Sequence, residues 1–351
     1  MPKKKIKILD VTVRDGSYLM SFKYTAAQVG EIVSKLQSCG IEYAEIGHGI
    51  SFGAKKAGLP AASADEEQIE AAYKVRRGAK HKIKLGVIGL LPIFNPEDLK
   101  PVAKKLHFVR LACNVILPDY LEDIIQKCKN MGLKVFVQMM RSSAVEAKVA
   151  AESAKKLVEY GADVIYIVDT AGAFLPNEVA DFIKRVKDAS KKEVGFHAHN
   201  NLMLATANTV AAAQAGADFI DASLRGVGRG SGNVPLEILV LLLKKYKYEC
   251  KINAKRLFIA TEKLEDKLWK YVPRVPVSDP YLAAKKRDFF PFQLLEKIAK
   301  ELKVPVYSII DDLVKFKAGT ELSLDDIGDI IVGRGRDENE VFKKIGLIPS
   351  V

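Results

Sequence analysis

The chain has few of the residues that mark secreted, disulfide-linked or membrane-spanning proteins. Its 351 residues include only four cysteines and one tryptophan. The cysteines are widely spaced and form no Cys-x-x-Cys pair, so the sequence indicates neither a disulfide framework nor a zinc knuckle. No apolar run is long enough to cross a bilayer, and the amino terminus has no secretory signal. We therefore expect a cytoplasmic globular protein that contacts no membrane.

An excess of positive charge is the one unusual feature of the composition. The formal net charge is +12 at pH 7. Such a charge can serve nucleic-acid binding, an anionic substrate or only a lysine-rich surface. The lysines are spread over segments with helical periodicity, and the short basic start at residues 2–5 leads directly into a predicted strand. The sequence therefore predicts no nucleic-acid partner.

Apolar, strand-like runs recur along the chain, and segments with helical periodicity separate them. The predicted strands are residues 6–13, 43–47, 84–91, 108–112, 134–139, 164–168, 194–198 and 219–224. The predicted helices include residues 27–36, 66–75, 120–131, 145–160, 177–186 and 205–215. Eight strands followed by eight helices within about 245 residues are typical of one α/β fold, the (β/α)₈ TIM barrel.

A doubly wound open sheet is the structural alternative. It would not need eight units, and its glycine-rich phosphate fingerprint does not follow the first strand, where residues 12–16 contain a single glycine. After about residue 250 the pattern changes to helical segments at 257–272, 292–302 and 306–317, separated by breaks that contain proline. We therefore predict a barrel domain over residues 1–250 and a helical C-terminal domain over residues 251–351.

A His-x-His pair ends the seventh predicted strand. Alternate side chains of a strand share a face, so the imidazoles of His197 and His199 should converge. Neutral imidazole is a common ligand of divalent metals, and two of them form part of a coordination shell. The alternative is a hydrogen-bonded pair that holds no metal.

Polar residues at the ends of other strands would share the mouth of the barrel, where TIM-barrel active sites lie. Asp15 could complete a metal set with the two histidines, or it could be a helix cap or the ion-pair partner of Arg14. Arg14 could stabilise an enolate or hold a carboxylate, or it could only pair with Asp15 or Glu45. A glycine-rich loop at residues 226–237 could present N–H groups to an anion, or it could be a tight turn that closes the barrel.

Three of these segments together are similar to a known family. Residues 10–16, 196–201 and 228–237 resemble the HMG-CoA lyase-like, or DRE-TIM, metallolyase superfamily, and most closely its 4-hydroxy-2-oxovalerate (4-hydroxy-2-oxoacid) aldolase branch. Further similarity lies at residues 24–25, 45–49, 169–172 and 221–224. The resemblance runs in order over nearly the whole barrel and is weaker across the C-terminal domain.

The resemblance implies a metal site and an activity. Asp15, His197 and His199 would bind a divalent metal, usually Mn²⁺ or Mg²⁺, with Co²⁺ or Zn²⁺ as alternatives. Arg14 would stabilise the enolate of a 2-oxoacid such as pyruvate, and Thr170 would help to hold the substrate beside His197. The implied enzyme is a carbon–carbon lyase that cleaves a 4-hydroxy-2-oxoacid to pyruvate and an aldehyde, or forms it from them.

Tyr18 departs from the family, whose aldolases carry a histidine base at this position. A phenol with an ordinary pKa of about 10 is a poor base at neutral pH. Three interpretations follow: Tyr18 is an activated acid or base, His48 at the neighbouring strand end takes over, or Tyr18 is a pocket wall in an enzyme with altered chemistry. The aldolases also use a tyrosine of the C-terminal domain, for which Tyr281 is the candidate.

Two other functions stay open at this point. One is a Claisen-type condensation of an acyl-CoA with a 2-oxoacid, as in the isopropylmalate synthase branch. The other is a non-catalytic partner subunit, which the missing histidine motivates. The related aldolases pair with an acylating aldehyde dehydrogenase, so the resemblance implies such a partner. We also expect a homo-oligomer.

Overall fold

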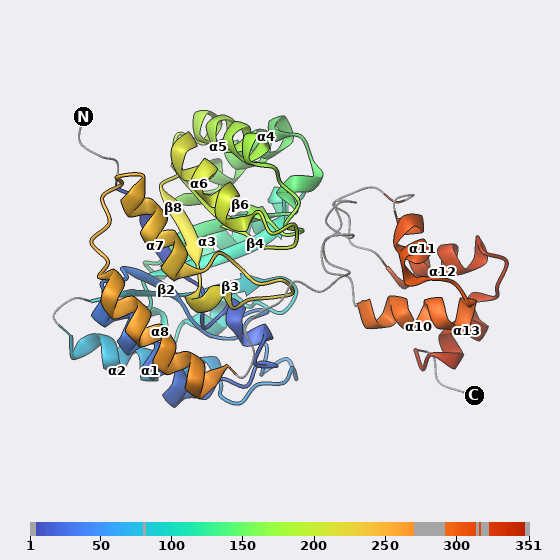
Figure 1. Cartoon of the computed structure of the whole chain (residues 1–351), viewed down its shortest axis with the longest axis horizontal. Helices are drawn as coiled ribbons and strands as arrows, with labels where there is room; N and C mark the ends of the chain where they lie inside the picture. Colours follow the sequence, from blue (N-terminus) through green and yellow to red (C-terminus); the bar gives the residue numbers. More distant parts are fainter. Residues whose placement is uncertain (1–4, 80–81, 270–291, 314–315, 317–322, 348–351) are drawn as a thin grey trace.

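The computed structural model describes residues 5–79, 82–269, 292–313, 316 and 323–347. Eight parallel strands form a closed barrel in chain order, and β1 pairs with β8 to close it (Figure 1). The strands are β1 (Lys7–Asp10), β2 (Tyr43–Glu45), β3 (Lys84–Leu90), β4 (Phe108–Asn114), β5 (Lys134–Met140), β6 (Val164–Asp169), β7 (Glu193–Ala198) and β8 (Phe219–Ala222). Each predicted strand is present, and the TIM-barrel prediction is confirmed.

Helices surround the barrel, with one departure from the predicted eight repeats. The helices are α1 (Ala26–Cys39), α2 (Asp65–Arg77), α3 (Glu122–Asn130), α4 (Ala147–Glu159), α5 (Pro176–Ser190), α6 (Ala205–Ala215) and α7 (Leu236–Lys245). Between β3 and β4, over residues 91–107, the described chain forms only two 3₁₀ turns, η2 (Pro96–Leu99) and η3 (Ala103–Lys105). Pro96 begins the first turn and Pro101 lies between the two. Proline has no N–H and ends a helix, so a regular helix does not form there.

Aromatic side chains fill the amino-terminal half of the barrel interior. They are Tyr43, Phe108, Phe136, Tyr166 and Phe219, all buried. Two glycines face these rings from neighbouring strands. A Cβ atom on Gly86 would lie 2.2 Å from the ring of Phe108, and one on Gly195 would lie 2.4 Å from the ring of Tyr166. Only glycine leaves room for the rings at these two positions.

The interior becomes charged two residues further along the same strands. Arg110 follows Phe108 on β4, and Asp221 follows Phe219 on β8. Because alternate residues of a strand share a face, these charged side chains also point into the barrel. They form the floor beneath the carboxyl ends of the strands.

Helix α8 (Ala254–Leu268) follows the predicted domain boundary in the chain and packs on the barrel. Its residues Leu257, Leu264 and Leu268 belong to the same apolar core as the barrel. The helix packs against α1 and α7, beside which it lies in Figure 1. Just after it, Trp269 Nε1 donates a hydrogen bond of 2.7 Å to the hydroxyl of Tyr24. The apolar face of α8 is therefore buried on the barrel, beyond the predicted boundary at residue 250.

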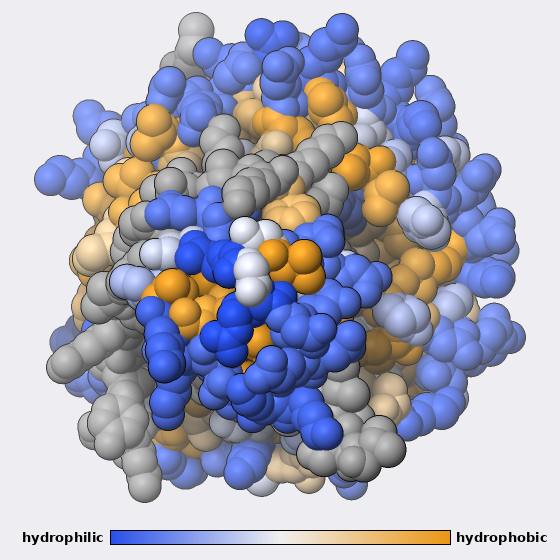
Figure 2. Space-filling view, turned by 90° about the vertical axis from the view of Figure 1, so that its right-hand side faces the viewer, coloured by the Kyte–Doolittle hydropathy of each residue, from blue (hydrophilic) through white to orange (hydrophobic). Residues whose placement is uncertain are grey.

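The remaining described helices share a core of their own. They are α10 (Phe292–Leu302), α11 (Val306–Asp312), α12 (Leu324–Val332) and α13 (Glu338–Lys344). Leu295, Ile309 and Ile331 are fully buried among them. Figure 2 shows the face that lies to the right in Figure 1, where hydrophilic residues cover most of the surface around small hydrophobic areas. The division of the chain into two domains stays a prediction.

None of the helices in the described ranges combines the length and the apolar character that a membrane span requires.

Candidate metal centre and active site

Asp15, His197 and His199 come together at the carboxyl end of the barrel. Asp15 begins the 3₁₀ turn η1 (Asp15–Tyr18) after β1, His197 lies in β7, and His199 follows that strand. One ligand atom from each residue lies within 4.8 Å of the others, and all three side chains are buried. The two imidazole rings are 5.0 Å apart and nearly perpendicular. The convergence that strand alternation predicts for the histidines is present.

The ring of His197 is oriented by a carboxylate. Its Nδ1 atom lies 2.8 Å from Oδ2 of Asp221, which faces it from β8. This contact fixes the orientation of the ring and leaves Nε2 to face the site, as carboxylate partners of metal-binding histidines do. His199 has a weaker contact of the same kind, with Nδ1 at 3.4 Å from the carbonyl oxygen of Gly232. Both rings are therefore held from behind.

The protonation states of the three residues suit a divalent cation. Burial lowers the pKa of His199 well below its ordinary value, so the imidazole is neutral at pH 7. Burial alone would raise the pKa of Asp15, but the charge of Arg14 and a hydrogen bond from Asn233 hold it below its usual range. An ionised carboxylate and neutral imidazoles are the forms that bind metals. The residues present therefore fit the metal that the family resemblance implies.

A buried ion-pair network lies beneath these ligands. Arg14 donates to Asp15 at 2.7 Å and to Glu45 at 2.8 Å. Arg110 donates to Glu45 at 3.1 Å and to Asp221 at 2.6 Å. The network thus connects Asp15 to the carboxylate that orients His197. It joins two guanidinium groups to three carboxylates.

The glycine-rich loop packs directly against Asp15. Asn233 Nδ2 donates a hydrogen bond of 2.6 Å to Oδ2 of Asp15, and the backbone N–H of Arg229 lies 3.4 Å from the same atom. A Cβ atom on Gly228 would lie 2.7 Å from that oxygen, so a larger residue would displace the carboxylate. The anion that this loop meets in the structure is the side chain of Asp15. The loop therefore positions a predicted metal ligand.

A cavity of about 100 Å³ opens above the ligands. Its polar walls are Arg14, Asp15, Tyr18, Gln138, Thr170, His197, His199 and Arg229. The hydroxyl of Thr170 accepts a hydrogen bond of 2.7 Å from the N–H of Arg141, and its carbonyl accepts one of 2.9 Å from Arg229. The predicted metal ligands and the predicted substrate residues Arg14 and Thr170 thus surround one space.

The candidate acid–base residues differ in their placement. Tyr18 lines the cavity, and burial raises the pKa of its phenol further above the ordinary value. His48 does not line the cavity. Its Nε2 lies 3.0 Å from the carbonyl oxygen of Pro60, and its ring stacks on Phe22 with the centroids 4.6 Å apart. Tyr281 lies outside the described residues. The acid–base roles stay predictions, and the geometry favours Tyr18 over His48.

Several interactions within the site are not apparent from the sequence. Asp221, Arg110 and Asn233 act on the ligands from behind, and Arg229 adds a second guanidinium group to the cavity. The inward position of Arg110 and Asp221 could be found by counting two residues from Phe108 and Phe219. Their partners could not, because the contacts join strands that are far apart in the chain.

Comparisons with known proteins indicate the family of the chain. Residues 114–263 match the model of the HMGL-like family. The chain is 35% identical over 329 residues to the oxaloacetate decarboxylase of Mycobacterium tuberculosis, with 93% of this chain and 96% of that protein covered. It is 38% identical over 263 residues to the 4-hydroxy-2-oxovalerate aldolase of Carboxydothermus hydrogenoformans, with 74% and 77% covered.

A likeness to a solved structure supports the fold alone. The carboxyl transferase domain of Rhizobium etli pyruvate carboxylase with pyruvate and biocytin has a TM-score of 0.73 at 16% identity, with 97% of this chain and 62% of that chain covered.

The closed barrel and the buried Asp-His-His set define a metal-binding TIM-barrel protein. The chain belongs to the HMGL-like family of divalent-metal-dependent enzymes, in its branch of carbon–carbon lyases related to the 4-hydroxy-2-oxovalerate aldolases.

Proposed function

We propose that the protein is an aldolase that cleaves 4-hydroxy-2-oxoacids to pyruvate and an aldehyde, or joins the two in reverse. The observation that supports this most is the buried set of Asp15, His197 and His199 with Arg14 beside it. A divalent metal held by these three side chains, for which we propose Mn²⁺ or Mg²⁺, would polarise the 2-oxo group and so lower the cost of forming the enolate.

Arg14 is suited to stabilise the enolate. Burial would lower its pKa, but Glu45 and Asp15 raise it, so the guanidinium stays charged. The same two carboxylates hold the side chain in place, which lets it meet negative charge without reorganisation during the reaction. We assign the substrate carboxylate to the opposite wall, where Thr170 and Arg229 lie.

Tyr18 is the candidate acid. Cleavage of the aldol needs a base for the 4-hydroxyl proton, breaks the C3–C4 bond, and then needs an acid that protonates C3 of the enolate. Because the pKa of Tyr18 is raised, its phenol is protonated at neutral pH and suits the last step better than the first. In the aldolase, Tyr18 would have to alternate between the two forms.

This property of Tyr18 favours a second candidate, the decarboxylation of oxaloacetate. There the C3–C4 bond breaks to release CO₂, and its electron pair forms the same pyruvate enolate. No base is needed to start the reaction, and only C3 must be protonated. The relative from Mycobacterium tuberculosis that bears this name covers nearly the full length of the chain.

One set of assays tests both candidates. We expect the Mn²⁺-loaded protein to cleave 4-hydroxy-2-oxovalerate and to exchange the methyl protons of pyruvate for deuterium, followed by proton NMR. Release of CO₂ from oxaloacetate without aldol cleavage would select the decarboxylase. Absence of all three reactions would exclude both candidates and leave the non-catalytic partner subunit. Release of free CoA from an acyl-CoA and a 2-oxoacid would instead indicate a Claisen-type enzyme.

The Tyr18→His variant sharpens the choice. If Tyr18 limits the aldolase as a poor base, the imidazole should raise the rate of aldol cleavage by about 10²-fold or more. A decarboxylase should gain nothing from the same change.

We also propose an acylating aldehyde dehydrogenase as partner and a homo-oligomeric state. Affinity capture from native extract with this chain as bait tests the first, and light scattering tests the second. Capture of this chain alone would contradict the partner, and a monomer mass would contradict the oligomer.

A further inference from the structure

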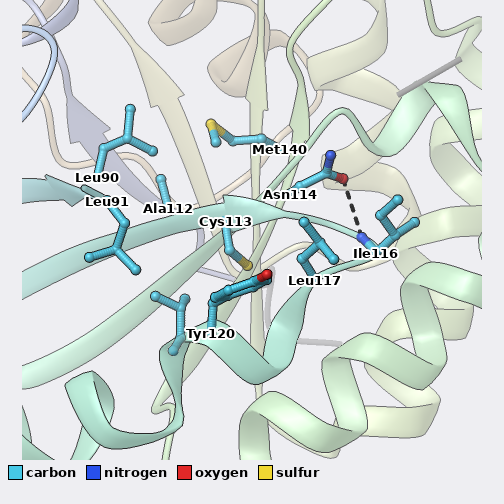
Figure 3. A pocket seen from close by; sticks show the side chains of 10 residues that line it. Leu90, Leu91, Ala112, Cys113, Asn114, Ile116, Leu117, Tyr120 and Met140 are labelled. Carbon is cyan, nitrogen blue, oxygen red and sulfur yellow. Dashed lines mark hydrogen bonds between the residues drawn. The ribbon is translucent and has the colours of Figure 1, made fainter. Parts of the chain in front are cut away.

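The cavity that Asp15, His197 and His199 line is called the metal pocket below. A second cavity lies beside it, at the carboxyl ends of β3, β4 and β5 (Figure 3). Its volume is about 300 Å³. Leu90, Ala112 and Met140 line this cavity and also line the metal pocket. These three residues lie at or near the ends of their strands and border both spaces. A molecule bound at the metal pocket would therefore have the second cavity next to it.

The second cavity is apolar. Its other walls are Leu91, Cys113, Asn114, Ile116, Leu117, Tyr120 and Leu121. None of these described lining residues carries a charge. The thiol of Cys113 is neutral, because burial raises its pKa to about 12. Figure 3 shows that side chains from β4 and from the turn that follows it, among them Cys113, Leu117 and Tyr120, border the space.

The two cavities differ in the chemistry that they can bind. The metal pocket contains two arginines, three metal ligands and a phenol, and it suits the charged end of a 2-oxoacid. The second cavity suits an uncharged apolar group. A volume of about 300 Å³ equals roughly ten water-sized groups at about 30 Å³ each, which is far more than a methyl group needs.

We propose that the second cavity binds the aldehyde half of the substrate, and that the protein prefers 4-hydroxy-2-oxoacids with a long aliphatic or an aromatic group on C4. This inference rests on the proposed aldolase function. Decarboxylation of oxaloacetate releases CO₂ and gives an apolar cavity of this size nothing to bind.

The first test is a substrate series with the Mn²⁺-loaded full chain. Its members are 4-hydroxy-2-oxoacids that carry methyl, propyl, pentyl or phenylmethyl on C4, and kcat/KM is measured for each. We expect about a fourfold rise per added methylene up to the pentyl compound, because each buried methylene contributes a constant transfer free energy. Equal values along the series, or a preference for the methyl compound, would overturn the inference while leaving the aldolase function in place.

The second test needs no catalysis. Straight-chain 2-oxoacids from pyruvate to 2-oxononanoate lack the 4-hydroxyl group and cannot undergo aldol cleavage. Titration calorimetry of the Mn²⁺-loaded protein should give dissociation constants that fall with chain length in the same way. Affinity that rises with length in a protein that cleaves no aldol would support the apolar cavity and refute the aldolase function. Affinity that is independent of length would refute the cavity as a binding site.

Variants at the rim of the cavity connect both tests to the structure. Leu117 is 44% exposed and Tyr120 is 68% exposed, so Leu117→Ala and Tyr120→Ala should fold. Each should lower the ratio of kcat/KM for the pentyl compound to that for the methyl compound about fivefold or more. Leu241→Ala is the matched control, because this leucine is 45% exposed on α7 and does not line the cavity. An unchanged ratio in both rim variants would overturn the inference.

Discussion

The two halves of the barrel interior hold opposite kinds of side chain. Toward the amino ends of the strands, Phe136 stacks on Phe108 with the centroids 4.9 Å apart and meets Phe219 edge-on at 5.2 Å. Toward the carboxyl ends, Arg110 and Asp221 form an ion pair of 2.6 Å with almost no exposure to solvent. One half is a packed apolar core, and the other is a buried charged network beneath the metal ligands.

The difference shows how closely a stabilising layer and a reactive layer can lie. Phe108 and Arg110 are two residues apart on β4, so their side chains are separated along the strand by roughly 7 Å. The aromatic layer buries apolar surface and stabilises the fold. The charged layer is costly to bury, and its value lies in orienting the residues of the site. We expect mutations in the two layers to affect different properties.

The largest effect should come from removing a charge from the carboxyl-terminal half. Arg110→Met leaves Glu45 and Asp221 buried without their shared partner, which should lower the free energy of unfolding by about 3–5 kcal/mol. Urea denaturation measures the loss. Arg185→Met is the control, because its ion pair with Asp181 is exposed and should matter by less than about 1 kcal/mol. If Arg110→Met unfolds at the same urea concentration as the wild type, the buried ion pairs of Arg110 do not contribute to the free energy of unfolding.

A smaller effect should follow from crowding the aromatic half. Gly86→Ala places a methyl group 2.2 Å from the ring of Phe108, and overpacking of this kind should cost about 1–3 kcal/mol of stability. The affinity for Mn²⁺ should stay within a factor of about two, because the ligands lie in the other half of the barrel. Gly30→Ala in α1 is the control: its new methyl group meets Ala71 at 3.6 Å, and it should be neutral or stabilising. A large loss of Mn²⁺ affinity in Gly86→Ala would show that the two halves are coupled.

The sequence predicts which residues of one strand share a face, but not the pairing between strands. The period of two places His197 and His199 on one face, because that argument needs only one strand. The contact between Arg110 and Asp221 joins residues 111 positions apart, and it depends on the register of the whole barrel. No local pattern carries that register. Asp15 is a candidate ligand because it ends the first predicted strand, and its approach to the histidines depends on the closed barrel.

Two other features could not be predicted from the sequence for local physical reasons. His48 follows a strand in the sequence as a catalytic residue could, yet its ring contacts Pro60 and Phe22 and does not line the cavity. The 3₁₀ turns between β3 and β4 replace a predicted repeat because prolines interrupt that segment. In each case the βα pattern predicts the usual arrangement, and local contacts or residues cause the departure from it.

The third effect concerns the metal rather than the fold. Asp221→Asn keeps the size of the side chain but weakens the contact that orients His197, at 2.8 Å in the structure. Loss of such a partner should lower the affinity for Mn²⁺ about 10- to 100-fold. Titration calorimetry with Mn²⁺ measures it, and Asp181→Asn on the exposed face of α5 is the control. An unchanged Mn²⁺ affinity would mean that the charged layer does not act on the ligands.

The smallest effect is a pH dependence at the amino-terminal rim, next to the aromatic layer. Burial, and then the charges of Arg76 and Lys84, lower the pKa of His107 from 6.5 to about 4. The unfolded chain therefore takes up a proton near pH 6.5, whereas the folded chain resists it until about pH 4. The free energy of unfolding should be constant above pH 6.5 and fall as the pH drops from 6.5 to 4.

The size of this loss should be about 1–2 kcal/mol, because partial exposure of His107 reduces the effect. His107→Gln removes the titrating group, so its urea midpoint should change less between pH 7 and pH 5 than that of the wild type. His107 lies directly before β4, at the amino end of the barrel, whereas the predicted metal ligands lie at the carboxyl end. The Mn²⁺ affinity of the variant should therefore match that of the wild type at pH 7. An identical pH slope in both proteins would assign the acid sensitivity to the carboxylates of the charged half instead, and the aromatic half would then carry no pH response of its own.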